Sequence, residues 1–336
     1  MPTQLRLDQI KYQNSLASQA IINSCGDVAQ RGTSIALTTA DGYTLDYWYA
    51  DTATAGDDKT VSQQISDVNG SYHSIRVQRP NGQTTTTLIR LSQALESQNS
   101  IPFRGQKMTL SFYAKAGANF SASGGTMVAK IVTGKGTDQK LNAFTTSADA
   151  GSANCTLTTT STKFTLTTSA VIASDITQIG VSFAYTPVGT ASTNDWFEVT
   201  QVVLNAGDVA LPFMPKSYAQ ELDDCQPYYE KSYEQGTNPG TSTSLGSVVL
   251  SVGNNTTTAY KEITVSFKKT KRSVPTIVIY DKAGNSGKIT TIDATTTETD
   301  NVTGNISSPS QSGFLLYDNT SNEAGFKFHW TAEAEL

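Results

Sequence analysis

The sequence has few charged residues and no long apolar run. Charged residues make up 16% of the 336 positions, and 24 Lys+Arg against 29 Asp+Glu give a net charge of −5. Proteins that hold nucleic acid need a basic surface to neutralise phosphates, so we expect no nucleic-acid partner. No segment approaches the roughly 20 apolar residues that span a bilayer, so we expect no membrane insertion. The N-terminal region also lacks a basic start followed by an apolar stretch, so we expect no export by a Sec signal.

Cysteine and histidine are scarce and widely spaced. The three cysteines, Cys25, Cys155 and Cys225, form no CxxC pair, and we expect them to be small buried residues rather than zinc or redox ligands. The two histidines, His73 and His329, have no second His or Cys at ligand spacing. These absences argue against a His-based catalytic triad and against a His-rich metal centre.

Threonine-rich segments and alternating hydrophobic residues indicate β-strands. Threonine-rich runs with few charges, such as 84–87, 156–168 and 295–297, suit the surface of a sheet. Met108, Leu110, Phe112 and Ala114 alternate with polar or amphipathic residues, which predicts a strand with one buried and one wet face. Similar short strands recur between glycine-rich turns without helical patterns, so we expect an antiparallel jelly-roll β-sandwich.

One short helix and a second β unit follow. Ser217 and Gln220 form a capping-box pattern, and Pro227 prevents the helix from continuing. Beyond it, 276–280 predicts a buried strand, and Phe326, Phe328 and Trp330 predict one face of a final strand. The fold class is therefore all-β, with a jelly-roll β-sandwich, a short helical joint and a second, smaller β-sandwich. The expected domains are an N-terminal docking arm (1–24), the jelly roll (25–215), the joint and linker (216–239) and a β-sandwich tip (240–336). The alternative for residues 1–24 is a strand or short helix that covers the domain.

The sequence predicts no catalytic site and no cofactor. It contains no phosphate-binding loop, dinucleotide-binding glycine pattern or GxSxG elbow. The neighbouring carboxylates Asp57-Asp58 and Asp223-Asp224 would point to opposite faces of a strand, which makes poor acid–base pairs. Asp41, Asp46 and Asp195 offer oxygen ligands near expected strand ends, but their spacing matches no calcium loop. A structural calcium ion is thus unsupported, and we expect no enzyme activity.

Aromatic clusters make sugar binding the best chemical hypothesis. A glycan presents apolar C–H faces and hydroxyl groups, so its receptor combines aromatic rings with Asn, Asp, Gln, Ser or Thr. The densest cluster is Tyr47-Trp48-Tyr49, and Trp196 lies in the next one. We name these four residues as candidate glycan-binding residues. The alternative is that the tryptophans belong to the core, as most tryptophans of β-sandwiches do.

An ordered series of short motifs resembles bacteriophage and prophage tail-fibre-like virion proteins that carry a carbohydrate-binding-module-like jelly roll. The motifs are INSCGD at 22–27, QRGTS at 30–34, YTLDYWY at 43–49, PFRGQKMTLSFYAK at 102–115, FEVTQVVLNAGD at 197–208 with LPF at 211–213, ELDDCQPYY at 221–229, and FHWTAEAEL at 328–336. The strand at 102–115 is the most specific of them. The resemblance runs in order through most of the chain, and its functional content is an analogy at the level of the fold.

The resemblance implies a structural protein of the virion, assembled in the bacterial host cytoplasm. The N-terminal arm would attach it to other virion proteins, and the β domains would project toward host surface polysaccharide. The usual symmetry of such fibres implies a homotrimer. Two alternatives remain: a capsid decoration or head-fibre protein that stabilises the shell, and a non-catalytic module of a carbohydrate-active enzyme.

Overall fold

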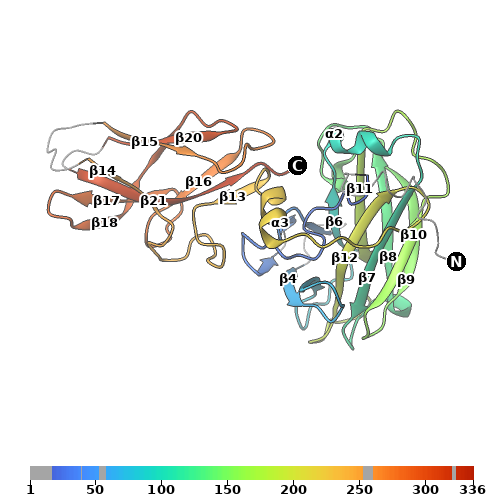
Figure 1. The fold of residues 1–336 in the computed structure, drawn as a ribbon. Helices are drawn as coiled ribbons and strands as arrows, with labels where there is room; N and C mark the ends of the chain where they lie inside the picture. The colour runs from blue at the N-terminus through green and yellow to red at the C-terminus, as the bar shows by residue number, and fades with distance from the viewer. Residues whose placement is uncertain (1–16, 39, 53–57, 253–259, 320–322) are drawn as a thin grey trace. The chain divides into compact units, whose positions relative to one another are not determined.

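A computed structural model describes residues 17–38, 40–52, 58–252, 260–319 and 323–336. The chain divides into two compact units (Figure 1). Of the described residues, the first unit comprises those from 17 to 27, those from 33 to 218 and Leu336, and the second comprises those from 28 to 32 and from 219 to 335. Within the described ranges, no helix is both long enough and apolar enough to cross a membrane.

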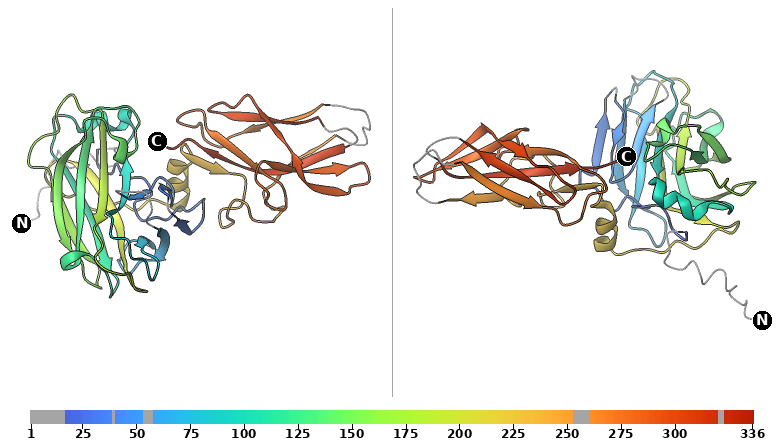
Figure 2. Two further views of the ribbon diagram at one scale, coloured as in Figure 1. Left: turned by 180° about the vertical axis from the view of Figure 1, so that it is seen from behind. Right: turned by 90° about the horizontal axis from the view of Figure 1, so that it is seen from above.

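The first unit is a sandwich of two six-stranded antiparallel sheets (Figure 2). Sheet 1 has the order β1 (Ser34–Leu37), β4 (Lys59–Ile65), β5 (His73–Gln78), β12 (Trp196–Ala206), β7 (Met108–Ala116) and β10 (Thr162–Thr167). Sheet 2 has the order β2 (Gly42–Tyr43), β3 (Tyr49–Thr52), β6 (Ile89–Ala94), β11 (Gln178–Tyr185), β8 (Thr126–Gly134) and β9 (Ala148–Thr156). Most neighbouring strands are not consecutive in the chain, although β2–β3, β4–β5 and β8–β9 are. The predicted all-β jelly roll is confirmed.

Aromatic rings from both sheets fill the space between them. Phe112 of β7 meets Phe183 of β11 edge to face, with ring centroids 4.7 Å apart. The predicted alternation of β7 is correct on its inner face, where Met108, Leu110 and Phe112 are buried. Its other face is less wet than predicted, because Thr109 is also buried and its hydroxyl donates a hydrogen bond to the carbonyl of Gly207 at 2.9 Å.

Residues 17–24, which the sequence assigns to a docking arm, pack as part of the first unit. The amide of Ala20 donates a hydrogen bond to the carbonyl of Leu204 at 3.1 Å. The amide of Ala206 donates one to the carbonyl of Ala17 at 2.8 Å. β5 pairs only with the first part of β12, Trp196–Val199, so this segment continues along the remainder of that strand. The rest of the expected arm, 1–16, lies outside the described residues.

Short helical segments connect the strands of the first unit. They are α2 (Ser97–Ser100) and the 3₁₀ turns η1 (Ile101–Phe103), η2 (Ser123–Gly125) and η3 (Leu141–Ala143). The helix predicted after Ser217 is present as α3 (Tyr218–Cys225). The division between the two units falls between Tyr218 and Ala219, at the first turn of this helix.

The second unit is a smaller β-sandwich built around β21 (Glu323–Glu333). In its larger sheet, one edge of β21 pairs with β13 (Tyr229–Lys231) and β14 (Val248–Ser251). The other edge of β21 pairs with β16 (Thr276–Tyr280) and β17 (Lys288–Asp293). Strand β18 (Glu298–Thr303) pairs with β17. The smaller sheet is β15 (Lys261–Ser266), β20 (Gly313–Asp318) and β19 (Asn305–Ser307). Phe326, Phe328 and Trp330 share the core face of β21, as predicted.

Residues 28–32 belong to the second unit, although the sequence places them within the jelly roll. The side-chain amide of Gln30 donates to the carbonyl of Tyr229 at 2.8 Å. The guanidinium of Arg31 lies 3.8 Å from the centre of the Tyr229 ring and pairs with Glu335 at 3.0 Å. This short segment is therefore held by β13 and by the C-terminal residues of the chain.

Candidate functional site

Sheet 2 has an outer face that the alternation of its strands makes polar. The register places Ser92 of β6, Ser182 of β11, Lys130 of β8 and Ser152 of β9 in one row across the sheet. The next row contains Arg90, Ala184 and Val128. Directly opposed residues of an antiparallel pair lie on the same face, so these side chains share one surface.

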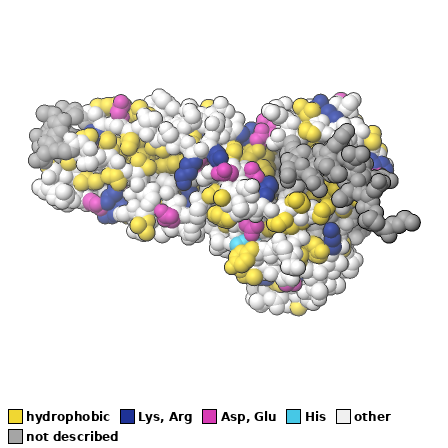
Figure 3. Space-filling model, viewed as in Figure 1, with side chains coloured by type: hydrophobic (Ala, Val, Ile, Leu, Met, Phe, Trp, Pro, Cys, Tyr) yellow, Lys and Arg dark blue, Asp and Glu magenta, His cyan; other side chains and the backbone are white. Residues whose placement is uncertain are grey.

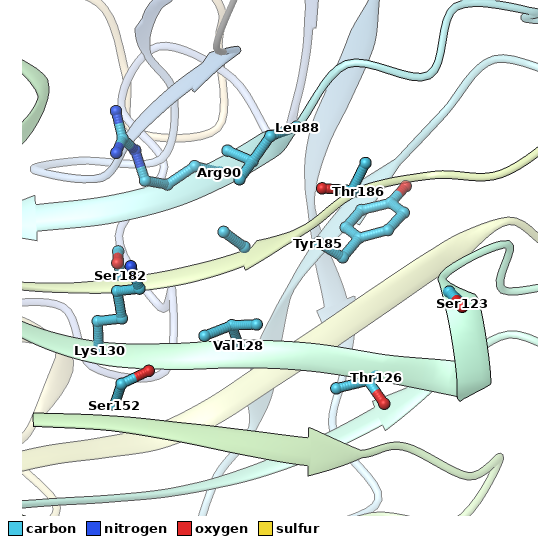
Figure 4. Close-up of a pocket in the computed structure, with 11 residues that line it drawn as sticks. Leu88, Arg90, Ser123, Thr126, Val128, Lys130, Ser152, Ser182, Tyr185 and Thr186 are labelled. Atoms are coloured by element: carbon cyan, nitrogen blue, oxygen red, sulfur yellow. The ribbon is translucent and has the colours of Figure 1, made fainter.

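A cavity of about 460 Å³ lies on this surface. Ser182 and Ala184 form its floor, because the outward positions of β11 are small while Val181 and Phe183 point into the core. Larger side chains of the neighbouring strands border it (Figure 4). The lining residues are Leu88, Arg90, Ser123, Thr126, Val128, Lys130, Ser152, Ser182, Ala184, Tyr185 and Thr186.

Apolar residues cover the outer face of β11 beyond the cavity, at its N-terminal end. A Cβ added to Gly180 would lie 2.7 Å from a methyl group of Leu141, so glycine lets η3 lie against the strand. Leu141 clusters there with Ala94, Val132 and Phe144. The open part of the face is therefore limited to the Ser182–Thr186 half.

The charged residues of the cavity are each balanced by a carboxylate. Arg90 donates from Nε to Asp51 Oδ1 at 2.8 Å and from Nη2 to Oδ2 at 2.5 Å, which is a bidentate pair. Lys130 pairs with Asp149 at 2.7 Å. The site therefore presents hydrogen-bond donors without a strong net field.

The titratable side chains that line the cavity, among the described residues, are those of Arg90, Lys130 and Tyr185. None of its lining residues is an aspartate or glutamate. The two carboxylates beside it, Asp51 and Asp149, are committed to ion pairs with Arg90 and Lys130. Glycoside hydrolysis needs two carboxyl groups facing each other across the substrate, and the described lining of this cavity contains no such pair.

The first predicted aromatic cluster lies in the core of the first unit. Trp48 is 0% exposed, and its indole N–H donates to the carbonyl of Asn23 at 2.9 Å. Tyr47 is also buried, and Tyr49 is 8% exposed at the β3 end of the Ser92–Ser182 row. A sugar cannot reach the ring of Trp48, so the alternative interpretation of this residue as core applies.

Trp196 lies on sheet 1 and therefore does not join the other candidates. Its ring is partly exposed, and the guanidinium of Arg76 lies 4.0 Å from the ring centre. A Cβ added to Gly117 would come within 2.8 Å of two indole atoms, so the ring also packs against that glycine. These neighbours cover part of the ring surface that a sugar would need.

The carboxylates considered for calcium are occupied by protein groups. Asp195 pairs with the fully buried Arg79 at 2.8 Å, and Asp41 pairs with Lys59 at 3.0 Å. Asp46 is buried. Among the residues that the structure describes, no group of three or more His, Cys, Asp or Glu side chains is placed to hold a metal ion.

The thiols are buried and lack activated character. Burial raises the pKa of Cys25 and that of Cys155 to about 11. Both thiols are therefore protonated near neutral pH, whereas reactive cysteines have lowered pKa values.

The sequence did not nominate the cavity residues Arg90, Lys130, Ser182 and Ala184. A signal was nevertheless present: Ser182 and Ala184 alternate with Val181, Phe183 and Tyr185. A run of small outward residues on a central strand indicates a depression between neighbouring strands with larger side chains. Recognising it requires knowing that β6 and β8 flank β11.

No family model matches the chain, and no curated protein matches it. The solved structures that are similar to this chain include carbohydrate-binding modules. A CBM4 structure shows 16% identity and a TM-score of 0.33, covering 55% of this chain and 97% of its own. The CBM22-1 xylan-binding domain of Paenibacillus barcinonensis Xyn10C shows 13% identity and a TM-score of 0.31, covering 55% and 100%. TmCBM61 in complex with β-1,4-galactotriose shows 11% identity and a TM-score of 0.27, covering 47% and 88%.

Proposed function

We propose that the cavity on sheet 2 binds a neutral saccharide without cleaving it. The observation that carries this proposal is the combination of a serine- and alanine-lined floor with charge-balanced Arg90 and Lys130 at the walls. The volume of about 460 Å³ lies within the roughly 300–1,000 Å³ typical of ligand sites.

The lining matches both surfaces of a sugar ring. Hydroxyl groups such as those of Ser182 and Ser152 donate and accept hydrogen bonds, as sugar hydroxyls do. Arg90 uses Nε and Nη2 for Asp51 and has no partner for Nη1 among the described residues, so that group is a donor for a ligand. Val128, Leu88 and Ala184 offer apolar contact to C–H groups.

The test is a substitution that fills the cavity. Ala184→Leu adds bulk at the floor and is expected to lower saccharide affinity at least about tenfold, measured by titration calorimetry with a saccharide identified on an array of bacterial surface polysaccharides. Thr165→Leu is the matched control, because Thr165 is exposed on β10 in the other sheet. Binding by Ala184→Leu equal to that of the parent chain, or an array with no bound saccharide, would contradict the proposal.

We further propose that this binding serves a bacteriophage virion protein, as a fibre or tail-fibre-like component that contributes to host-surface attachment. The ordered motifs from residue 22 to Leu336 support this proposal. The visible surface is also mostly uncharged (Figure 3), as suits recognition through hydrogen bonds. A homotrimer would place three weak sites on one particle component and multiply their avidity.

Labelled antibodies against each unit test the location on the particle. A projecting position for at least one unit is expected. A position of both units flat on the capsid lattice would instead identify a decoration protein, and absence from purified particles would remove the virion role. The mass of the assembled protein, with and without reductant, tests the trimer and any cysteine cross-link.

A further inference from the structure

The smaller sheet of the second unit presents an outer face of aromatic, hydroxyl and amide groups. On β15, Glu262, Thr264 and Ser266 point outward and alternate with the more buried Lys261, Ile263 and Val265. The register sets Glu262 beside Tyr317 and Asn305, and Thr264 beside Leu315 and Ser307. Each of these rows therefore crosses the three strands on one face.

A cavity of about 260 Å³ lies on this face. Thr264, Ser266 and Leu315 line it from the strands, and Ser308, Ser310 and Ser312 line it from the loop between β19 and β20. None of the lining residues is charged. The volume is just below the roughly 300 Å³ at which typical ligand pockets begin, so it suits a single sugar ring.

The backbone holds this cavity in a defined shape. The hydroxyl of Ser310 donates to the carbonyl of Gly313 at 2.9 Å, and the Ser312 amide donates to the Ser310 hydroxyl at 3.3 Å. A Cβ at Gly313 would lie 2.2 Å from the carbonyl oxygen of Val265, so only glycine allows β20 and β15 to approach this closely. The serine loop is thereby fixed against the end of the sheet.

A pair of tyrosines lies further along the same face. The rings of Tyr260 and Tyr317 are stacked, with centroids 4.9 Å apart and an angle of 27° between their planes. Tyr260 is 55% exposed. Tyr317 is two residues from Leu315, and same-face residues two apart on a strand are separated by about 6.6 Å, so an extended ligand in the cavity can also contact the rings.

We infer that the outer face of β15, β20 and β19, from the serine loop to the Tyr260–Tyr317 pair, is a second saccharide-binding surface. One neutral sugar ring occupies the cavity between Thr264 and Ser310, and the next ring contacts Tyr317. Aromatic faces bind the C–H surface of a sugar, and the hydroxyl and amide groups around them supply hydrogen bonds. The inference is independent of the first cavity, because it concerns residues of the other unit.

The protonation state of Tyr260 is compatible with this role. Partial burial, with the nearby Glu262 carboxylate and Tyr317, raises the pKa of Tyr260. Its phenol therefore stays protonated at neutral pH, hydrogen-bonded to the Glu262 carboxylate, and its ring stays uncharged. The serine hydroxyls also keep their capacity to donate and accept hydrogen bonds at neutral pH.

The experiment uses the full chain on the same array of bacterial surface polysaccharides. In the Ala184→Leu background, residual binding is expected, and Thr264→Trp is expected to abolish it by filling the second cavity. Tyr317→Ala is expected to reduce it about fivefold, in line with the contribution of one aromatic contact. Thr299→Trp on the exposed part of β18 and Tyr72→Ala, at a 70% exposed tyrosine of the first unit, are the matched controls.

The outcomes separate the two sites. If residual binding in the Ala184→Leu chain is absent, or is unchanged by both Thr264→Trp and Tyr317→Ala, the second surface is not a saccharide site. If Ala184→Leu has no effect while Thr264→Trp abolishes all binding, the second surface is the site and the first cavity is not. Should Thr264→Trp fail to fold, as judged by near-ultraviolet circular dichroism, Tyr317→Ala decides.

Discussion

Both units are β-sandwiches, but their strand pairings are distributed differently among the strands. In the first unit, twelve strands are divided between two sheets, and each strand has at most two neighbours on the sheet path. In the second unit, β21 alone pairs with β13, β14, β16 and β17. The strand β21 therefore organises the larger sheet of its unit, whereas the first unit distributes its strand pairings over many strands.

The two units also differ in how buried cations hold their loops. In the first unit, Arg79 bonds Asp195, the Ser121 hydroxyl and the carbonyls of Gln83, Thr85 and Gly189. In the second, Lys271 bonds the Glu230 carboxylate at 2.5 Å and the carbonyls of Gln226 and Lys269. The planar guanidinium of Arg79 thus binds groups from several loops, whereas the ammonium of Lys271 binds groups from fewer segments.

The largest effect is expected from truncating the core face of β21. Phe328 is fully buried between Val248 on β14 and the rest of the aromatic core. Phe328→Ala removes this contact and leaves a cavity, which costs about 4 kcal/mol in the free energy of unfolding. Trp330 lies in the second unit, whereas Trp48 and Trp196 lie in the first. Denaturant titrations of single-tryptophan variants, followed by fluorescence, therefore distinguish the unfolding of the two units.

The expected result is early unfolding of the second unit with an unchanged first unit. Val249→Ala, at an exposed position of β14, is the control and is expected to change the free energy by less than about 0.5 kcal/mol. A simultaneous loss of both units in Phe328→Ala would show that the first unit depends on β21, and the comparison would fail.

The next largest effect is expected at Arg79. Arg79→Ala removes the charge partner of the buried Asp195 carboxylate and one donor to each of three loop carbonyls, which costs the first unit about 3 kcal/mol in the free energy of unfolding. Lys135→Ala breaks an exposed ion pair with Asp175 and serves as the control, with an expected cost below about 1 kcal/mol. Equal midpoints of urea unfolding for the two variants would contradict a special role of the buried guanidinium.

The alternation of apolar and polar residues along the sequence predicted the fold, because several strands show this alternation clearly. The strand at 276–280 and the aromatic face of β21 follow directly from the sequence. The exposure of side chains could not be predicted from the sequence in the same way. Trp48 and Trp196 both lie in aromatic clusters of the sequence, but Trp48 is in the core and Trp196 is on a sheet surface. Exposure depends on strand neighbours, which are distant in the chain.

Threonine runs show where β propensity failed as a guide. Residues 84–87 were expected on a sheet surface, but they form an irregular loop between β5 and β6. The carbonyl of Thr85 instead accepts a hydrogen bond from Arg79 at 2.7 Å. Residues 295–297 likewise lie at the turn between β17 and β18, where Asp293 accepts hydrogen bonds from the amides of Thr295 and Thr297. These tertiary and turn contacts outweigh intrinsic propensity.

The smallest expected effect is a pH dependence confined to the second unit. His329 is buried, and its ring is stacked on Tyr233 with centroids 3.8 Å apart. Its Nε2 bonds the carbonyl of Thr243 at 3.1 Å, and its Nδ1 lies 3.2 Å from the Ser232 hydroxyl. This arrangement satisfies the neutral ring with Nε2 as donor and Nδ1 as acceptor.

Burial lowers the pKa of His329 from its ordinary value of 6.5, and the bond to the Thr243 carbonyl opposes this shift only in part. The unfolded chain therefore binds the proton more readily than the folded one. The contribution of His329 is fully present above pH 6.5 and declines as the pH falls from there through the lowered folded pKa. Urea titrations between pH 7 and pH 5, monitored at Trp330, are expected to show a falling free energy for the second unit. A His329→Gln variant is expected to lose this slope, and a slope equal to that of the parent would place the titrating group elsewhere.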